Sequence, residues 1–303
     1  MIRAELRKTG GGPMAEAVFR DYDQQRLNAE YNNRAKVANA DDYKAAQSVT
    51  SDRVRATANG RLDVAYGDAP DERLDIFPAS GAGPHPVHVF FHGGYWKSNR
   101  KEDFAFAANP FIGFGATAVV AEYALIPGVT MAELIRQCRA ALAWVWRNAG
   151  SFGGDRGRIS VSGHSAGGHI TAMMMATDWP AFDKGLPADL VKAGIGISGL
   201  YDLVPVQISS QNDDLGLTAE EALEFSPVLM TPRGGGKLLL PVGGDEGPEF
   251  IRQADDLAAA WSAKGVEARS WILPGDNHFS IVNQYIDPNS VLSRAARELI
   301  GLG

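Results

Sequence analysis

One short motif limits the possible folds of this chain more than any other part of the sequence. The stretch Gly163 to Gly167, which reads Gly-His-Ser-Ala-Gly, follows the apolar run Ile159 to Ser162 and opens the helical pattern Ala166 to Thr177. A serine on a sharp turn between a strand and a helix is held in strained geometry with its hydroxyl exposed, and its flanking glycines avoid collisions with neighbouring backbone. The motif therefore predicts a nucleophile, Ser165.

From about residue 60 onward, short apolar runs alternate with longer helical patterns, which indicates an α/β class with a mostly parallel sheet covered by helices. The expected strands are Leu62 to Tyr66, Leu74 to Phe77, Val87 to Phe91, Thr117 to Ala121, Ile159 to Ser162, Ala193 to Ser198, Leu238 to Val242 and Ala268 to Leu273. The first two are close in sequence and are expected to be antiparallel. The expected helices are Glu102 to Phe114, Met131 to Ala149, Ala166 to Thr177, Pro248 to Lys264 and Ser290 to Ile300.

Three segments lie outside this alternation. Residues 1–13 end in three glycines and a proline, and we expect them to be a flexible extension before one domain over residues 14–303. Residues 14–58 are polar with little to bury, so we expect them to lie over the sheet rather than form a domain. The segment Leu200 to Arg233 is longer than a simple connection. These last two segments are expected to form a lid over the site.

Charge and apolar content exclude several classes of partner. The net charge is −7 with no sustained run of Lys or Arg, which disfavours nucleic acids and anionic membranes. No stretch reaches the roughly 18 apolar residues of a membrane span, and the N-terminus has no apolar core of the signal-peptide kind. The single cysteine, Cys138, lies in an apolar helical pattern and is expected to be a buried, inert thiol. We therefore expect a cytoplasmic protein.

A second motif, His92-Gly93-Gly94-Tyr95-Trp96, follows the strand Val87 to Phe91. Backbone N–H groups of Gly93 and Gly94, with the N–H of Ala166, could stabilise the oxyanion of a tetrahedral intermediate. Loss of one such donor typically raises the barrier by about 3 kcal/mol. The alternative is a plain glycine turn between a strand and a helix.

The base follows from the expected chain order of nucleophile, acid and histidine. The chain has six histidines, and only His278 lies beyond the helix that follows Ser165. It sits in the loop Pro274 to Phe279 after the last expected strand. As an ordinary surface histidine it would leave Ser165 without a base, so we expect His278 to be catalytic.

The acid has three candidates at the ends of expected strands. Asp245 and Glu246 follow the strand Leu238 to Val242, the usual place for the residue that orients the imidazole, and Asp202 follows the preceding strand. Neighbours along a loop point in different directions, so only one of Asp245 and Glu246 should reach His278.

Other motifs are weak, and no cofactor or metal is expected. His88 and His92 are roughly 13 Å apart along one strand at ~3.3 Å per residue, too far for one zinc ion with ligands at ~2 Å. Gly113-Phe114-Gly115 precedes a strand-like run, so it is not a dinucleotide loop. Gly234 to Lys237 lacks the length and the Ser or Thr of a phosphate loop.

The chain resembles the arylformamidase (kynurenine formamidase) branch of the esterase and lipase superfamily, from about Glu30-Tyr31-Asn32-Asn33-Arg34 to the C-terminus. The residues that carry the resemblance are His92 to Trp96 in the form H-G-G-x-W, Gly163 to His169, Ser198 to Leu203, Glu246 to Phe250, and Arg252-Gln253. The resemblance implies an α/β-hydrolase fold and Glu246 as the acid. Many relatives carry Asp there, and Gly247 stands where the family has Ser, so Asp245 stays open.

The resemblance also implies hydrolysis of N-formylkynurenine to kynurenine and formate, although many bacterial members look like esterases or amidases for other small substrates. We expect a small aromatic amide or ester as substrate, because Tyr95, Trp96 and Phe279 adjoin the catalytic loops. Those aromatics could equally be core packing. The alternatives are a general carboxylesterase and a non-catalytic scaffold that binds a ligand. The only protein partner we expect is a second copy of this chain, in a homodimer.

Overall fold

The computed structural model describes residues 16–302, which are built around one eight-stranded sheet. The strands lie in the order β1-β2-β4-β3-β5-β6-β7-β8. Their bounds are β1 Arg61–Ala65, β2 Arg73–Phe77, β3 His85–Phe91, β4 Thr117–Ala121, β5 Gly154–His164, β6 Val191–Ile197, β7 Lys237–Gly243 and β8 Glu267–Leu273. β2 is antiparallel to β1 and β4, and the other neighbours are parallel. All eight predicted strands and the antiparallel first pair are confirmed.

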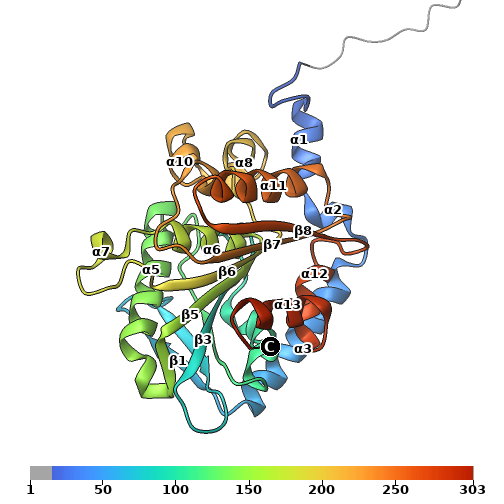
Figure 1. Ribbon diagram of the computed structural model, residues 1–303. Helices are drawn as coiled ribbons and strands as arrows, with labels where there is room; N and C mark the ends of the chain where they lie inside the picture. The colour runs from blue at the N-terminus through green and yellow to red at the C-terminus, as the bar shows by residue number, and fades with distance from the viewer. Residues whose placement is uncertain (1–15, 303) are drawn as a thin grey trace, which may run out of the picture.

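Helices cover both faces of this sheet (Figure 1). Their bounds are α1 Gln24–Glu30, α2 Asn33–Lys36, α3 Ala40–Thr57, α4 Asn109–Ile112, α5 Met131–Asn148, α6 Ala166–Ala176, α7 Trp179–Phe182, α8 Val204–Ile208, α9 Asn212–Leu215, α10 Ala219–Glu224, α11 Pro248–Ser262, α12 Ser280–Asn283 and α13 Val291–Leu299. Short 3₁₀ helices are η1 Lys101–Ala108, η2 Ala149–Phe152, η3 Pro227–Leu229 and η4 Gln284–Ile286. The predicted helices that correspond to α5, α6, α11 and α13 are confirmed.

The predicted helix over Glu102 to Phe114 is wrong in type. The chain forms the 3₁₀ helix η1 and then the short helix α4, in which Pro110 occupies one of the first two positions. A proline has no backbone N–H and disfavours the α conformation in the residue before it, so one continuous α-helix cannot run through this segment.

The two faces of the sheet pack against different helices. Alternate residues of β3 face opposite sides, so Val89 belongs to the larger core cluster and Phe90 to the second. The larger cluster contains apolar residues of α5, α6 and α11, and the second contains residues of η1, α4, α12 and α13. In Figure 1 the labelled helices α5, α6 and α11 lie on one side of the strands, and α12 and α13 lie on the other.

The N-terminal segment runs along one edge of the molecule, from α1 through α2 to α3 (Figure 1). α3 packs mainly against η1, and its Ser51 Oγ donates a hydrogen bond of 2.9 Å to the Asp103 carbonyl. The helix α3 therefore packs on η1, which in turn packs on β4. The expectation for residues 1–13 lies outside the described residues.

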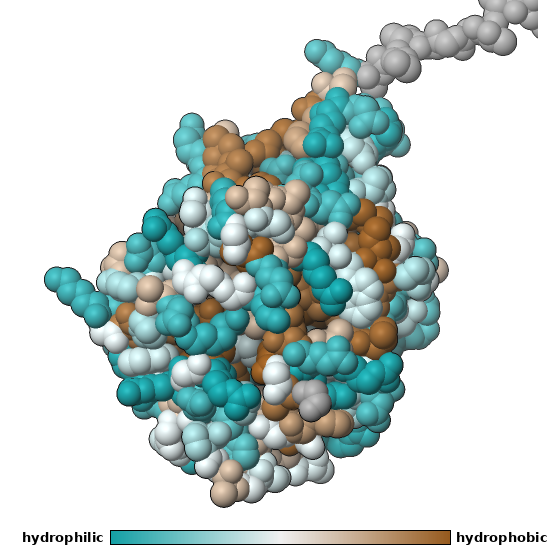
Figure 2. Space-filling view, in the orientation of Figure 1, coloured by the Kyte–Doolittle hydropathy of each residue, from teal (hydrophilic) through white to brown (hydrophobic). Residues whose placement is uncertain are grey.

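The surface is mixed in character. Figure 2 shows hydrophilic residues over much of the face in view, with smaller hydrophobic areas between them. Within residues 16–302, no helix combines the length and the apolar character needed to cross a bilayer. Cys138 is buried in α5, as expected from its helical pattern.

Candidate active site

Ser165 lies on the turn between β5 and α6, as the motif predicted. Its backbone has φ 56° and ψ −117°, a conformation that non-glycine residues rarely adopt. A Cβ added to Gly163 would lie 2.2 Å from the Gly167 carbonyl oxygen, and one added to Gly167 would lie 2.0 Å from the Phe91 carbonyl oxygen. Both positions therefore require glycine, because the backbone of the turn touches β3 and α6 directly.

Glu246 and His278 meet at the carboxyl ends of β7 and β8. The Glu246 Oε2 lies 2.6 Å from His278 Nδ1, and the two residues are 1% and 5% exposed. Burial strengthens a charge-assisted hydrogen bond because little water competes for either group. The contact fixes the orientation of the ring and leaves Nε2 as the nitrogen available for other partners.

The two other candidate acids lie elsewhere. Asp245 is exposed, and its backbone N–H donates to the Asp276 carbonyl at 3.0 Å. Asp202 forms an ion pair with Arg252 at 3.1 Å. Of the three carboxylates considered, only that of Glu246 contacts the His278 ring.

The second oxygen of Glu246 is also held. Its Oε1 accepts hydrogen bonds from the Gly243 backbone N–H, at 2.6 Å, and from the Ser198 hydroxyl. Ser198 belongs to a stretch that matched the family pattern, but the sequence assigned it no role. Both carboxylate oxygens are thus engaged, so the group has a single orientation toward the imidazole.

Gly247 stands where the family pattern has Ser, and the local backbone explains why glycine is needed here. Its φ is +110°, in the region that favours glycine. A Cβ there would lie 2.8 Å from Glu30 Oε2 and 2.9 Å from Lys36 Nζ. Lys36 also donates a 2.9 Å hydrogen bond to the Glu246 carbonyl, so the N-terminal segment supports the loop that carries this carboxylate.

Ser165 and His278 line one cavity together with His164. His164 Nε2 hydrogen-bonds to the His278 carbonyl at 2.8 Å, and the two ring centres are 4.6 Å apart. Among the described residues, no hydrogen bond within 3.5 Å joins the Ser165 hydroxyl to the His278 ring. Such contacts are often long without a substrate and tighten in the reacting complex.

His164 stays neutral beside His278. Burial lowers the pKa of His164 well below its usual range, and the nearby His278 lowers it further. Both causes favour the neutral form of the His164 ring. The residue before the nucleophile was not predicted to contribute, because its identity in the G-x-S-x-G pattern is variable.

Gly93 lies against the nucleophile, where the oxyanion motif was expected. A Cβ on Gly93 would lie 3.1 Å from the Ser165 Cβ and 2.7 Å from the His164 carbonyl oxygen. The Gly93 carbonyl accepts hydrogen bonds from Asn99 Nδ2 at 3.0 Å and from His92 Nδ1 at 2.9 Å. Because the peptide group is planar, fixing this carbonyl also fixes the direction of the Gly94 N–H.

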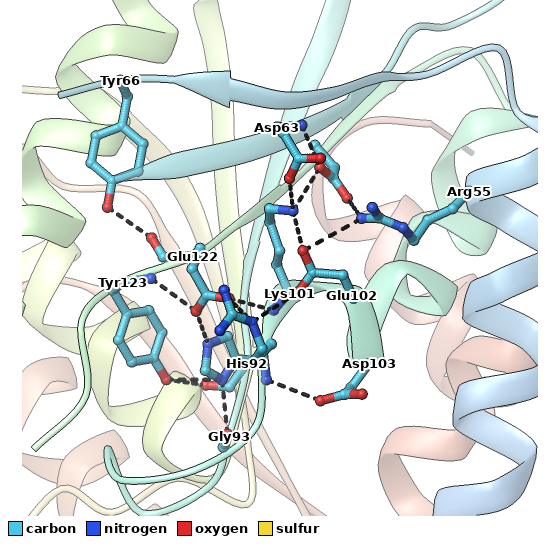
Figure 3. Close-up of polar contacts among 12 residues, drawn as sticks. Arg55, Asp63, Tyr66, His92, Gly93, Lys101, Glu102, Asp103, Glu122 and Tyr123 are labelled. Carbon is cyan, nitrogen blue, oxygen red and sulfur yellow. Dashed lines mark hydrogen bonds and ion pairs between the residues drawn. The ribbon is translucent and has the colours of Figure 1, made fainter. Parts of the chain in front are cut away.

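A buried polar network fixes the position of the loop that contains His92 and Gly93 (Figure 3). His92 Nε2 lies 2.9 Å from Glu122 Oε1, and the Tyr123 hydroxyl donates to the His92 carbonyl at 2.7 Å. Glu122 Oε2 accepts from the Lys101 backbone N–H at 3.0 Å. Glu122 is 3% exposed and directly follows β4. Its contribution was not predicted, because no local pattern distinguishes this carboxylate from one in solvent.

The cavity at Ser165 has a volume of about 670 Å³. That size suits a small molecule. Its wall combines the nucleophile turn, the oxyanion loop, the His278 loop and the N-terminal segment, with Gln211 from the insertion after β6. Gln211 Nε2 and the Tyr95 hydroxyl both donate to the Tyr31 carbonyl, at 3.1 and 2.8 Å. The expected lid from these two segments is therefore present.

Of the three aromatic residues expected to bind substrate, Tyr95 and Phe279 line the cavity and Trp96 does not appear among its described lining residues. Trp96 is 0% exposed, and its indole N–H donates to His169 Nδ1 at 3.2 Å. The expectation that Trp96 contacts substrate is therefore corrected: its side chain packs in the core. Tyr95 and Trp96 have φ of 49° and 58°, so the chain turns sharply between the two rings.

The chain matches known proteins over most of its length. The BD-FAE family matches residues 74–225. Kynurenine formamidase from Danio rerio is 30% identical over 83% of this chain and 85% of that enzyme. Kynurenine formamidase from Drosophila melanogaster is 26% identical over 84% of this chain and 82% of that enzyme.

Solved structures share the fold. A crystal structure from Silicibacter, provisionally described as a thioesterase, is 29% identical and superposes with a TM-score of 0.79 over 91% of this chain and 98% of that chain. An esterase from the archaeon Pyrobaculum calidifontis is 18% identical, with a TM-score of 0.65 over 92% of this chain and 95% of that chain. The architecture is that of the α/β-hydrolases.

Proposed function

Because the chain belongs to the kynurenine formamidase family of serine hydrolases, we propose that it hydrolyses the formamide bond of N-formylkynurenine or of a closely similar aryl formamide. The products are formate and an aromatic amine. The observation that carries the proposal is the contact between Glu246 and His278, because His278 also lines the cavity that contains Ser165.

In the proposed mechanism, the Ser165 hydroxyl attacks the formyl carbon while His278 Nε2 takes its proton. Glu246 stabilises the imidazolium that forms. The backbone N–H groups of Gly93, Gly94 and Ala166 hold the oxyanion of the tetrahedral intermediate. Collapse of this intermediate breaks the C–N bond, and His278 returns the proton to the leaving aromatic amine.

The formyl ester on Ser165 is then hydrolysed by the reverse sequence of proton transfers. His278 takes a proton from water, whose oxygen attacks the same carbon, and it returns the proton to the Ser165 oxygen as formate leaves. Both halves use one base and one oxyanion site, so no further catalytic group is required.

Tyr95 and Phe279 support an aromatic substrate, because both rings line the cavity beside the nucleophile. Flat apolar side chains favour a planar leaving group. A general carboxylesterase would use the same nucleophile, base and oxyanion site, and the Silicibacter structure adds thioesters to the acyl compounds worth testing. The distinction therefore depends on relative rates rather than on the catalytic residues.

The test is a rate survey with purified protein. We expect the highest kcat/KM for N-formylkynurenine, and lower values for p-nitrophenyl acetate and for an aryl thioacetate. The Ser165→Ala variant should lose turnover of every substrate and keep the melting temperature of the wild type. Fast ester cleavage with no formamide cleavage would identify a carboxylesterase instead.

A non-catalytic scaffold is the alternative from a different functional class. A fluorophosphonate probe should label the wild type at Ser165 and leave the Ser165→Ala variant unlabelled. Absence of labelling in the folded wild type would support the scaffold.

We also propose a cytoplasmic location, because the only cysteine is buried in α5, where burial raises the pKa of its thiol well above the usual range.

A further inference from the structure

His92 begins the oxyanion loop, residues 92–96, and both nitrogens of its ring contact hydrogen-bond acceptors. Nδ1 lies 2.9 Å from the Gly93 carbonyl oxygen, and Nε2 lies 2.9 Å from Glu122 Oε1. A carbonyl oxygen can only accept, so Nδ1 carries a proton. A neutral imidazole has a proton on one nitrogen only, so the proton at the second contact belongs to the imidazolium form of His92 or to a protonated Glu122.

The hydroxyl of Tyr123 does not change this count. It lies 3.2 Å from His92 Nδ1, but it donates its proton to the His92 carbonyl at 2.7 Å. Burial raises the pKa of Tyr123 well above its usual range, so the hydroxyl stays neutral. Both oxygens near Nδ1 therefore act as acceptors toward the ring.

The surroundings of Glu122 are those of an ionised carboxylate. Its Oε1 accepts from the Tyr123 backbone N–H at 3.1 Å, and its Oε2 accepts from the Lys101 backbone N–H at 3.0 Å. The guanidinium of Arg100 adds positive charge, with Nε 3.8 Å from Oε2. Hydrogen bonds from several donors favour the charged form of a carboxylate. The proton at the contact with His92 therefore lies on Nε2, and the ring is an imidazolium.

The other groups around the ring are compatible with its positive charge. Tyr123 and Phe104 stack on it with ring centres 4.3 and 5.9 Å away, and the faces of aromatic rings attract cations. The ammonium group of Lys101 is directed toward Asp63, 2.6 Å away, so its charge is compensated elsewhere (Figure 3). The ring is 0% exposed and Glu122 is 3% exposed. Together they form a buried ion pair with no net charge.

The imidazolium acts on the oxyanion site through one peptide group. The Gly93 carbonyl and the Gly94 N–H belong to the same peptide, and this N–H is one of the donors that the proposed mechanism directs at the oxyanion. A hydrogen bond from a charged donor to the carbonyl polarises the peptide, which makes its N–H a stronger donor. Asn99 also donates to this carbonyl at 3.0 Å, but without a charge.

We propose that Glu122 holds His92 as an imidazolium, and that this buried charge strengthens the oxyanion site next to Ser165. His92 is a positioning residue, because it acts through the Gly93–Gly94 peptide and takes no part in proton transfer. The inference rests on the proposed hydrolysis at Ser165. It does not depend on the choice between a formamide and an ester, because either substrate passes through an oxyanion.

Nitrogen NMR of protein with ¹⁵N-labelled histidines measures the protonation state directly. The two nitrogens of an imidazolium have similar shifts, whereas those of a neutral ring differ widely. At about pH 8, where an ordinary histidine is neutral, we expect an imidazolium signal in the wild type that is lost in Glu122→Gln. Glu72→Gln is the matched control and should keep the signal, since Glu72 is also buried and pairs with Arg136 at 2.8 Å. If Glu122→Gln removes no imidazolium signal, the inference is overturned.

Steady-state kinetics measure the effect on the oxyanion. Glu122→Gln should lower kcat about tenfold with KM little changed, because the lost interaction strengthens in the transition state; this is less than the 10²–10³-fold loss on removal of a whole donor. The effect should be similar for N-formylkynurenine and p-nitrophenyl acetate, and Glu72→Gln should keep the wild-type kcat. An unchanged kcat in folded Glu122→Gln, or a loss confined to KM, would overturn the inference.

Binding of phenylboronic acid tests the oxyanion site without turnover. This compound forms a tetrahedral adduct with an active serine, and an oxygen of the adduct can occupy the oxyanion site. Weaker binding to Glu122→Gln than to the wild type and to Glu72→Gln would support the inference even if N-formylkynurenine is not cleaved. Equally tight binding to all three proteins would overturn it.

Discussion

Glu246 and His278 lie 32 positions apart in the sequence, and their side chains meet at 2.6 Å in a place where both are almost completely buried. The neighbouring carboxylate, Asp245, is exposed. Asp245 and Glu246 can therefore be compared directly: they are adjacent in the sequence, and only Glu246 contacts the imidazole of His278.

Glu246→Gln should lower kcat/KM by about 10²–10⁴-fold, because an amide neither fixes the His278 tautomer nor stabilises the imidazolium. Asp245→Asn is the matched control and should retain near wild-type activity. Steady-state kinetics on both variants, with circular dichroism to establish folding, would check this. Equal losses in the two variants would contradict the assignment of Glu246 as the acid.

The oxyanion loop supplies a second prediction, through Asn99. Its Nδ2 donates to the Gly93 carbonyl, and in Asn99→Asp two acceptors would face each other. We expect kcat to fall about tenfold with KM little changed, less than the 10²–10³-fold loss seen when an oxyanion donor is removed outright. Asn59→Asp is the control, since Asn59 is exposed and also has positive φ. A change in KM alone would argue against a role for Asn99 in orienting the loop.

The turn that carries Ser165 has a steric requirement that stability measurements can test. In Gly163→Ala the new methyl group would lie 2.2 Å from the Gly167 carbonyl oxygen, which is backbone and cannot move aside. The cost should reach or exceed the ~1–3 kcal/mol typical of overpacking. Gly150→Ala, where a Cβ meets no atom within 4 Å, should stay within about 0.5 kcal/mol of the wild type. Urea unfolding compares the two; similar values would disprove the steric account.

Two buried histidines predict how stability depends on pH. Burial lowers the pKa of His88 to about 3 and that of His169 to about 4, below the ordinary value of 6.5. Both stay neutral in the folded protein, whereas the unfolded chain takes up protons once the pH falls below 6.5. The free energy of unfolding should therefore decrease between pH 6.5 and about 4, by about 1.4 kcal/mol per pH unit for each histidine.

Urea unfolding at several pH values in this range would measure that slope. His88→Gln should reduce the slope by the contribution of one histidine, whatever its effect on stability at pH 7. His88 hydrogen-bonds to Ser160 and Ser162 at 2.8 and 2.6 Å, so some loss at neutral pH is expected. An unchanged slope in the variant would show that His88 is not the neutral histidine described above.

Much of the fold was predictable because its signals are local. Strand and helix periodicities are set by residues two to four positions apart, and all eight strands follow them. The signal for the turn at Ser165 was equally local, because the strand, the glycines and the helix follow one another directly in the sequence. The predicted helix over Glu102 to Phe114 was wrong in type, because the segment forms a 3₁₀ helix followed by a short α-helix that contains Pro110.

The sequence by itself determined the residue types of the site: a serine on a strand–helix turn, a glycine pair after β3, and one histidine after β8. Only the tertiary structure decided which carboxylate meets His278, that Trp96 is buried against His169, and that Glu122 contacts the ring of His92. The physical reason is distance along the chain. Each of these outcomes depends on contacts between segments that packing brings together, and no local pattern encodes which way a loop side chain faces.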